Sequence, residues 1–410
     1  MKQSPNRTVV TSFSTPSSSV TDYDEGHYVL HVTTSGPQSP SSSPPPHFVN
    51  FVSCALTNHS ILTYDATTLQ QTHSISAHDE RITDLSYIQN TANVCLGSCG
   101  YDGQIKIWDV RTPPSAAPVI NMTLPRKDVP LSTSFGYNGA LAAVGGAKGL
   151  VYFYDLRNVS SGGGRMGVDV GGGDKPLGQY SNAHTDEVTQ VQFQPSENGA
   201  SPLLLTGSED GLACVFDTSQ ASEEKALKSI LNISSPLRHV GFFGPNLEGV
   251  YCLTGSESLS VWHHDSAQRI RDFGPHVRDT LSGLGGGGGM LIQYLVNCHW
   301  DGRNLNLVAG NSDGVSAVFC VDATGLAFQR QLNGGHKGCI RDYAVLGNGT
   351  ILTGGEDARM CEWTLGDASG IGDSARNEIN IRAGAKKGEY RNSGGGKMKR
   401  SKGKKGHAPY

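Results

Sequence analysis

The sequence predicts an all-β fold, a seven-bladed β-propeller in which seven similar segments of chain each form one blade. Three observations lead to this fold class: three stretches of the chain repeat one another, seven aromatic residues recur at nearly regular intervals, and strand–turn–strand patterns separate them. A repeat of this size buries its core only by stacking on its neighbours, and a closed ring satisfies every repeat. A chain of 410 residues can form one such domain.

The three strong repeats share four positions. Each has an Asp with a hydroxyl residue four positions before it, an aromatic residue six positions after it, and a His 21 to 26 positions before it. The members are His78, Ser98, Asp102 and Trp108; His184, Thr206, Asp210 and Phe216; and His336, Thr353, Asp357 and Trp363. We interpret each set as a buried hydrogen-bond network that fixes the blade, because a fully satisfied polar network specifies one geometry. Phe216 cannot donate a hydrogen bond, so the network of its blade should be shorter.

Weaker copies of the repeat fill the gaps between the strong ones. The aromatic position is occupied in turn by Tyr64, Trp108, Tyr154, Phe216, Trp262, Phe319 and Trp363. Most steps between them match a blade of about 40–45 residues. The two long steps contain glycine-rich inserts, at residues 160–173 and 283–289. Seven positions therefore predict seven blades.

The chain divides into a propeller and two polar ends. We expect a disordered N-terminus at 1–6, a propeller over 7–366 with a Ser/Pro-rich loop at 35–46, and a basic, largely disordered tail at 367–410. Two segments could supply the strand that closes the ring, Arg7–Ser14 and Glu378–Arg382. We favour the first, because charged and glycine-rich sequence surrounds the second.

Charge and cysteine usage exclude several classes of protein. The chain carries a formal charge of −4, although Lys386–Lys405 holds a cluster of basic residues, so the propeller itself is acidic. That distribution is not the footprint of a nucleic-acid-binding domain. The nine Cys form no C-x-x-C pair, no run of apolar residues could span a membrane, and the polar start lacks a secretory signal. We expect a nuclear or cytoplasmic protein that is not secreted, does not contact membranes, and is a monomer outside complexes.

Two sequence motifs known from enzymes occur here without the local structure that their chemistry requires. Gly310–Gly314 spells a nucleophile elbow, but it falls at a predicted hairpin turn instead of a strand-to-helix turn. Gly162–Gly167 spells a dinucleotide-binding loop, but it lies inside a glycine-rich insert with no strand and helix around it. The sequence therefore predicts a protein that is not an enzyme, with no cofactor and no metal site.

At this point the repeats resemble a known family. Ala183–Pro195 with Val215-Phe216-Asp217, and Gly334-Gly335-His336 with Leu352–Ala358 and Trp363, are similar to repeats of the WD repeat-containing protein 89 family. The resemblance runs from about residue 50 to the end, the basic tail included, and departs at the glycine-rich inserts and the Ser/Pro loop. It implies a WD-repeat β-propeller in which the conserved His, Asp, hydroxyl and Trp stabilise blades. Together with the lack of a supported catalytic constellation, it favours a non-catalytic scaffold for other proteins, whose identity the sequence does not give.

A second resemblance suggests an alternative function. Trp108-Asp109-Val110-Arg111 matches the W-D-x-R box of propellers that dock on the adaptor of cullin-4 ubiquitin ligases, and Tyr154–Arg157 is a variant in the next blade. The resemblance implies a substrate receptor of such a ligase. Its candidate adaptor contacts are Asp109, Arg111, Asp155 and Arg157.

The basic tail has three interpretations that the sequence leaves open. Its densest cluster is Lys397, Lys399, Arg400, Lys402, Lys404 and Lys405. The cluster could be a nuclear import signal, an arm that makes weak contact with RNA, or a solvated extension.

A truncation after Arg391 should separate these interpretations. If the cluster is an import signal, the truncated protein loses nuclear accumulation, as seen by imaging, and the full-length protein shows no RNA affinity at physiological salt. If it is an RNA arm, the full-length protein binds RNA with an affinity that falls steeply as salt rises, because binding releases counterions. Identical behaviour of both proteins in both assays leaves only the solvated extension.

Overall fold

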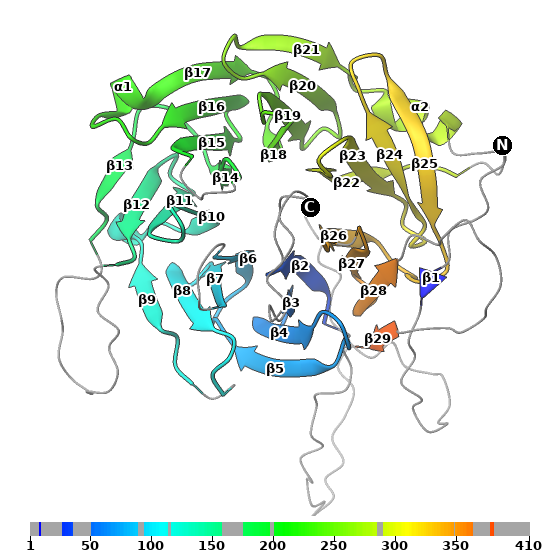
Figure 1. Cartoon of the computed structure of the whole chain (residues 1–410), viewed down its shortest axis with the longest axis horizontal. Coiled ribbons are helices and arrows are strands. Elements are labelled where there is room, and N and C mark those ends of the chain that lie inside the picture. Colours follow the sequence, from blue (N-terminus) through cyan, green and yellow to red (C-terminus); the bar gives the residue numbers. More distant parts are fainter. Residues whose placement is uncertain are drawn as a thin grey trace, which may run out of the picture.

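Seven antiparallel sheets stand around a central channel in the computed structural model, which confirms the predicted seven-bladed propeller (Figure 1). The structure describes residues 27–35, 51–88, 94–113, 116–157, 175–196, 201–284, 290–347 and 349–363, together with the backbone of Thr8–Val9 and Glu378–Asn380. In blades 1 to 6 the strands follow chain order from the channel outward, and in every blade the innermost strand lines the channel.

The first four blades account for the chain up to Asn232. Blade 1 holds β2 (Val29–Thr34), β3 (Phe51–Leu56), β4 (Ser60–Asp65) and β5 (Gln71–Ser76). Blade 2 holds β6 (Ile82–Tyr87), β7 (Cys95–Gly100), β8 (Gln104–Asp109) and β9 (Ile120–Thr123). A 3-10 turn, η1 (Pro125–Lys127), leads to blade 3, with β10 (Pro130–Gly136), β11 (Leu141–Gly146), β12 (Val151–Asp155) and β13 (Gly178–Tyr180). Blade 4 holds β14 (Val188–Phe193), β15 (Leu203–Ser208), β16 (Leu212–Asp217), the short helix α1 (Glu223–Ala226) and β17 (Leu227–Asn232).

The last three blades complete the ring. Blade 5 holds β18 (Leu237–Phe243), β19 (Gly249–Thr254), β20 (Leu259–His263) and β21 (Gln268–Asp272). Helix α2 (Val277–Leu284) precedes blade 6, with β22 (Tyr294–Trp300), β23 (Leu305–Gly310), β24 (Ser316–Val321) and β25 (Leu326–Leu332). Blade 7 holds β26 (Ile340–Val345), β27 (Ile351–Gly355), β28 (Arg359–Trp363), β1 (Thr8–Val9) and β29 (Glu378–Asn380). All seven of the aromatic residues used to count the repeats lie in the third strand of their blade.

Local sequence explains the hairpins. In blade 4 the turn Glu209-Asp210-Gly211 joins β15 and β16, which are buried along nearly their whole length. Gly211 has a φ of 83°, in the left-handed region that favours glycine. An added Cβ would also lie only 3.0 Å from the backbone nitrogen of Ser235. The turn therefore requires glycine at this position both for its φ angle and for the close approach of the neighbouring backbone.

The first strand of every blade carries a β-bulge at the same place. In all seven blades the residue after the bulge is polar; these residues are His31, Asp84, Ser132, Gln190, His239, Asn297 and Asp342. A bulge changes the direction of the side chains that follow it. The bulges therefore place one ring of polar residues along the channel.

This polar ring satisfies backbone donors that have no strand partner. The N–H group of the following residue donates to a side chain in every blade. Four of these bonds cross to the preceding blade, for example Val32 N–H to Asp342 Oδ2 at 2.9 Å and Thr133 N–H to Asp84 Oδ2 at 2.6 Å. The ring thus joins blades 7 and 1, 2 and 3, 3 and 4, and 4 and 5.

Tyrosine hydroxyls join the other three pairs of blades. Tyr87 shares a 2.7 Å hydrogen bond with Ser53 between blades 1 and 2. Tyr251 donates to the carbonyl of Cys298 at 2.9 Å between blades 5 and 6. Tyr343 donates to the carbonyl of Asn297 at 3.1 Å between blades 6 and 7. Every neighbouring pair of blades is therefore joined by a hydrogen bond close to the channel.

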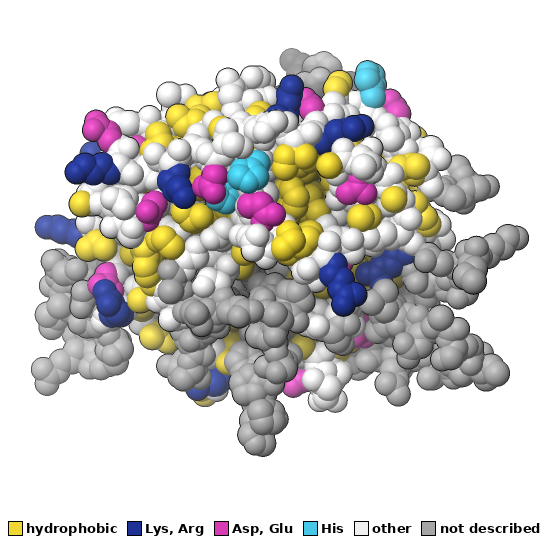
Figure 2. Space-filling view, turned by 45° about the horizontal axis from the view of Figure 1, so that its top comes forward, with side chains coloured by type: hydrophobic (Ala, Val, Ile, Leu, Met, Phe, Trp, Pro, Cys, Tyr) yellow, Lys and Arg dark blue, Asp and Glu magenta, His cyan; other side chains and the backbone are white. Residues whose placement is uncertain are grey.

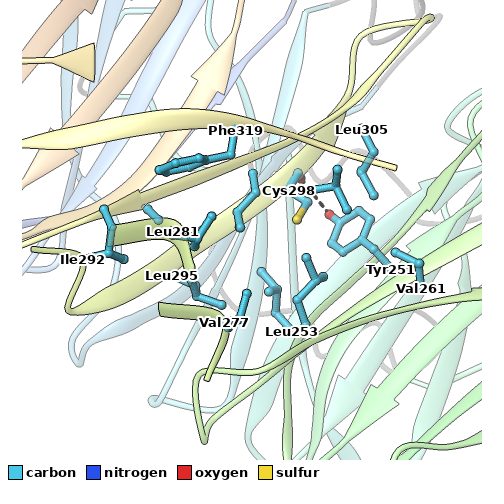
Figure 3. Packing of buried hydrophobic residues seen from close by; sticks show 14 of the residues in the cluster. Tyr251, Leu253, Val261, Val277, Leu281, Ile292, Leu295, Cys298, Leu305 and Phe319 are labelled. Atoms are coloured by element: carbon cyan, nitrogen blue, oxygen red, sulfur yellow. Dashed lines mark hydrogen bonds between the residues drawn. The ribbon is translucent and has the colours of Figure 1, made fainter. Parts of the chain in front are cut away.

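Apolar side chains fill the space between blades. The core between blades 5 and 6 also includes helix α2, whose buried residues Val277 and Leu281 pack against side chains of both blades (Figure 3). Val277 and Leu281 are one helical turn apart, so they present one apolar face to the core. The predicted loop at 283–289 differs here, because Gly283 and Leu284 form the end of α2; residues 285–289 lie outside the described residues.

The ring is closed by both ends of the chain. β1 pairs with Glu362 and Trp363 of β28, and β29 pairs with Arg359, Met360 and Cys361 of the same strand. The two segments considered from sequence thus both contribute, and β29 lies beyond the predicted propeller boundary at residue 366. The inserts at 35–46 and 160–173 lie outside the described residues, apart from Ser35.

Candidate functional site

The structure brings the four predicted residues of blade 2 together. His78 Nδ1 lies 3.0 Å from the carboxylate of Asp102, and its Nε2 lies 2.8 Å from the hydroxyl of Ser98. The indole N–H of Trp108 donates to the same hydroxyl at 2.9 Å. The network connects the loop before the blade, a hairpin turn and two strands, and so fixes all of them at once.

Burial favours the neutral form of two network histidines, His78 and His184. Desolvation lowers the pKa of His78 and of His184 below the usual 6.5, although the neighbouring carboxylates raise it in part. A neutral imidazole has one donor and one acceptor nitrogen. Nδ1 of His78 faces the carboxylate of Asp102, so it carries the proton, and Nε2 accepts from the hydroxyl of Ser98.

Blades 4 and 7 contain the other two predicted networks. His184 lies 3.1 Å from Asp210 and 2.7 Å from the hydroxyl of Thr206. Phe216 adds no donor, so this network ends at Thr206.

In blade 7 the full set is present. His336 lies 3.0 Å from Asp357 and 2.8 Å from the hydroxyl of Thr353, and the indole of Trp363 donates to that hydroxyl at 2.8 Å.

Blade 3 has a different network, which the repeat pattern missed. Asp128, in the loop before the blade, accepts the hydroxyl of Tyr152 at 3.0 Å and the backbone N–H groups of Val129 and Lys148. Its side chain is buried, as is the ring of Tyr152. In blade 3 the carboxylate lies in the loop before the first strand, where blade 2 has its histidine, and not in the hairpin turn, where blade 2 has Asp102. An Asp just before a first strand, with a Tyr on the third strand, is the signal that could have found it.

The predicted adaptor contacts form two matching ion pairs. The guanidinium of Arg111 donates to both carboxylate oxygens of Asp109, at 2.9 and 2.7 Å, and that of Arg157 donates to both oxygens of Asp155, at 3.0 and 2.9 Å. These hydrogen bonds lower the pKa of both carboxyl groups. The arginine side chains are 47% and 74% exposed, so each is oriented by its own Asp and accessible to solvent.

The channel opens on the same face as these arginines. A cavity of about 810 Å³ extends along it and is lined by loops between the first and second strands of blades 4 to 7. Gln190 and Gln192 of β14, and Gln194 directly after this strand, line the cavity. The buried Oε1 of Gln192 has no hydrogen-bond partner. Trp300 and Leu247 add partly buried apolar surface, so the wall combines amide and apolar groups.

On the face shown in Figure 2, charged side chains of both signs are interspersed. Ion pairs such as Lys228–Asp265 and Arg269–Asp272 also bring opposite charges together on the described surface. The cations on the face in Figure 2 do not form the basic stripe that tracks a nucleic acid backbone. Gly310–Gly314 spans the end of β23 and a hairpin turn, and Gly162–Gly167 and the cluster from Lys397 to Lys405 lie outside the described residues. Within the described ranges, metal-binding side chains do not gather in groups of three. Neither helix in that part of the chain is long and apolar enough to cross a bilayer.

Comparison with known proteins identifies the repeat. The family profile of the WD domain, G-beta repeat (WD40), matches residues 69–109 and 174–217. These segments contain the third strands of blades 2 and 4, and the same repeat geometry recurs around the ring. The chain is a seven-bladed β-propeller that contains WD repeats. This class of propeller typically serves as a non-catalytic scaffold for other proteins.

The WD-repeat propeller is similar to curated proteins along most of its length. It is 27% identical over 318 residues to the WD repeat-containing protein 89 homolog of Dictyostelium discoideum, covering 77% of this chain and 80% of that protein. It is 26% identical over 336 residues to WD repeat-containing protein GTS1 of Arabidopsis thaliana, covering 76% and 77%. An uncharacterized WD repeat-containing protein of Saccharomyces cerevisiae is 25% identical over 233 residues, covering 55% and 54%. The resemblance to the WD repeat-containing protein 89 family is therefore confirmed.

Removing the carboxylate of blade 2 should destabilise the propeller. Asp102→Ala leaves Nδ1 of the buried His78 without its partner, which should lower the free energy of unfolding by about 1–3 kcal/mol. Asp313→Ala is the matched control, because Asp313 holds the same turn position in blade 6 but is exposed. Urea denaturation of both variants checks this; equal, small losses would contradict a stabilising role for the network.

Lowering the pH should also destabilise the folded protein, because His184 is buried in its neutral form. The pKa of His184 is lower in the folded state than its usual 6.5, so the unfolded chain binds the proton first. The contribution of the neutral His184 to the free energy of unfolding should therefore be at its maximum above pH 6.5 and should decline as the pH falls below 6.5. His184→Gln should show a smaller difference between urea melts at about pH 7.5 and 5.5 than the wild type. An unchanged difference would mean that His184 does not titrate in this window.

Proposed function

We propose that this propeller is a non-catalytic platform that binds other proteins through the face on which Arg111 and Arg157 lie. The observation that supports it is the combination on one face of two matching, exposed arginines and the mouth of a cavity of about 810 Å³. WD-repeat relatives along most of the chain support the same class of function.

The arginines are suited to recognise carboxylates of a partner. Each guanidinium uses Nε and one Nη to bind its own Asp. This contact holds the long side chain in one orientation, which reduces the entropy lost on binding. Guanidinium groups bind carboxylates in a planar, two-point geometry. Exposed ion pairs stabilise a fold little, so their repetition in consecutive blades favours a role in binding.

A non-catalytic role is supported by the burial of an arrangement in blade 2 that imitates a catalytic site. Ser98, His78 and Asp102 have the connectivity of a hydrolase triad. The hydroxyl of Ser98 is fully buried and already accepts the indole N–H of Trp108. A substrate carbonyl could reach this oxygen only if the blade opened. The network therefore supports stabilisation and not acyl transfer.

Purification with matched surface variants should test the platform. The double variant Arg111→Ala, Arg157→Ala should lose proteins that the wild type captures from cell lysate, as measured by quantitative mass spectrometry. The control is Arg126→Ala, Lys127→Ala, which removes two exposed cations from the opposite face and should retain those proteins. If both double variants lose the same proteins, or neither loses any, the proposed binding face is wrong.

A second candidate, the substrate receptor of a cullin-4 ubiquitin ligase, is favoured by the paired Asp–Arg boxes in consecutive blades. In this case the adaptor subunit of the ligase should be among the proteins that the wild type captures and the Arg111→Ala, Arg157→Ala variant loses. If the wild type does not capture the adaptor, the receptor function fails while the platform proposal stands.

A further inference from the structure

An arginine in the outer part of blade 6 is partly buried and has no counter-ion among the described residues. Arg330 lies on β25, the outer strand of that blade (Figure 1). Its Nε and Nη1 are buried, and neither has a hydrogen-bond partner. The third nitrogen, Nη2, reaches the surface, because it is neither buried without a partner nor hydrogen-bonded. The guanidinium therefore keeps its donors unused at the boundary between the interior and solvent.

A β-bulge directs this side chain into the seam between blades 6 and 7. The register of β24 and β25 shifts between Val318 and Phe319. Phe328 is opposite Phe319, which belongs to the core shared with blade 5, and the two rings lie 5.9 Å apart. Arg330 is opposite Val318, which belongs to the core shared with blade 7. Because paired residues of neighbouring strands share one side of the sheet, Arg330 points toward blade 7.

The seam beside Arg330 is apolar. Val318 and Leu332, its neighbours on this side of blade 6, form one buried cluster with Cys361 and Trp363 of blade 7. Burial lowers the pKa of Arg330, and no charged side chain in the described part of the chain opposes this shift. A buried cation without a partner is unfavourable, and charges interact more strongly in such surroundings than in water. An anion that enters the seam should therefore be bound.

Blade 5 has an arginine at the same position, and that arginine has partners. Arg271, like Arg330, is opposite the residue that precedes the aromatic position of its blade. Its Nη1 donates to the carbonyl of Ala323 at 3.5 Å, and its guanidinium lies 5.6 Å from the centre of the Phe273 ring. Arg271 is also exposed, so water solvates its remaining donors. The missing partner is thus a property of Arg330 and not of the position.

The geometry of the guanidinium selects a carboxylate. Nε with Nη2, and Nη1 with Nη2, each form an edge of two N–H donors, and each edge joins a buried donor of Arg330 to the accessible one. A carboxylate that enters at Nη2 can bind the accessible donor with one oxygen and the buried donor with the other. Its single negative charge balances the single positive charge. A phosphate dianion would leave a second negative charge unpaired beside an apolar cluster.

We propose that Arg330 forms a binding site for a carboxylate ion in the seam between blades 6 and 7. The carboxylate supplies the counter-ion and accepts the donors that the folded chain leaves unused. Since such a ligand binds the folded state, it also stabilises the propeller. The site does not depend on the proposed binding face at Arg111 and Arg157.

Nuclear magnetic resonance of the full-length protein with isotope-labelled arginine tests the site directly. Acetate, titrated at constant ionic strength, should shift the Nε–Hε signal of Arg330 in a saturable manner, because the carboxylate accepts that hydrogen bond. Loss of the signal in Arg330→Lys, which keeps the charge but lacks the two-donor edge, assigns it. Acetate should also raise the melting temperature of the wild type and of the matched control Arg271→Met, but not that of Arg330→Met.

Four outcomes would overturn the proposal. Acetate could leave the signal of Arg330 unchanged, or it could raise the melting temperature of Arg330→Met as much as that of the wild type. A shift with phosphate but not with acetate would exclude a carboxylate site. A shift caused by Asp367→Asn without added acetate would mean that the chain supplies the carboxylate itself and that no external ligand is needed.

Discussion

Hydrogen bonds beside the channel hold each blade of this propeller to the next. Hydrophobic packing between blades is large but non-directional, so by itself it does not set the rotation of one sheet against its neighbour. The side chains of Asp84, Ser132, Gln190 and Asp342 accept backbone N–H groups of the following blade, and the hydroxyls of Tyr87, Tyr251 and Tyr343 join the remaining pairs. Since the first strand is an edge strand, these donors would otherwise be unsatisfied. The same bonds thus satisfy the inner edge and fix the position of every blade around the ring.

The fold was predictable because its strongest signals are local. The spacing from Asp102 to Trp108 and from Asp357 to Trp363 is fixed by a single hairpin, so it survives any insertion elsewhere. The aromatic position was therefore visible even in blades without the histidine. Phe216 showed from its chemistry alone that the network of blade 4 would end early.

The features that sequence reasoning missed depend on contacts across the blades. Asp128 and Tyr152 form a network in blade 3 from positions that the His–Asp spacing does not sample. The polar ring follows a β-bulge, and a bulge shifts the alternation by which strands are recognised. Helix α2 is eight residues long, too short for a clear helical period, and it is stabilised by burial between two blades. The use of both chain ends on β28 could not be foreseen, because each segment alone is a suitable strand.

The hydrogen bond between Val32 and Asp342 spans 310 residues of chain, and this has a consequence for synthesis. A ribosome makes blade 1 long before β26, β27 and β28 of blade 7, so the inner strand of blade 1 has one neighbour missing until these strands have been made. Contacts of such sequence separation form slowly, and an unpaired strand edge is prone to associate with other chains in the meantime. During synthesis the propeller is therefore an open arc in which the inner strand of blade 1 is exposed to association with other chains. How long it stays exposed depends on the time needed to translate the remaining blades as well as on the strength of the final contacts.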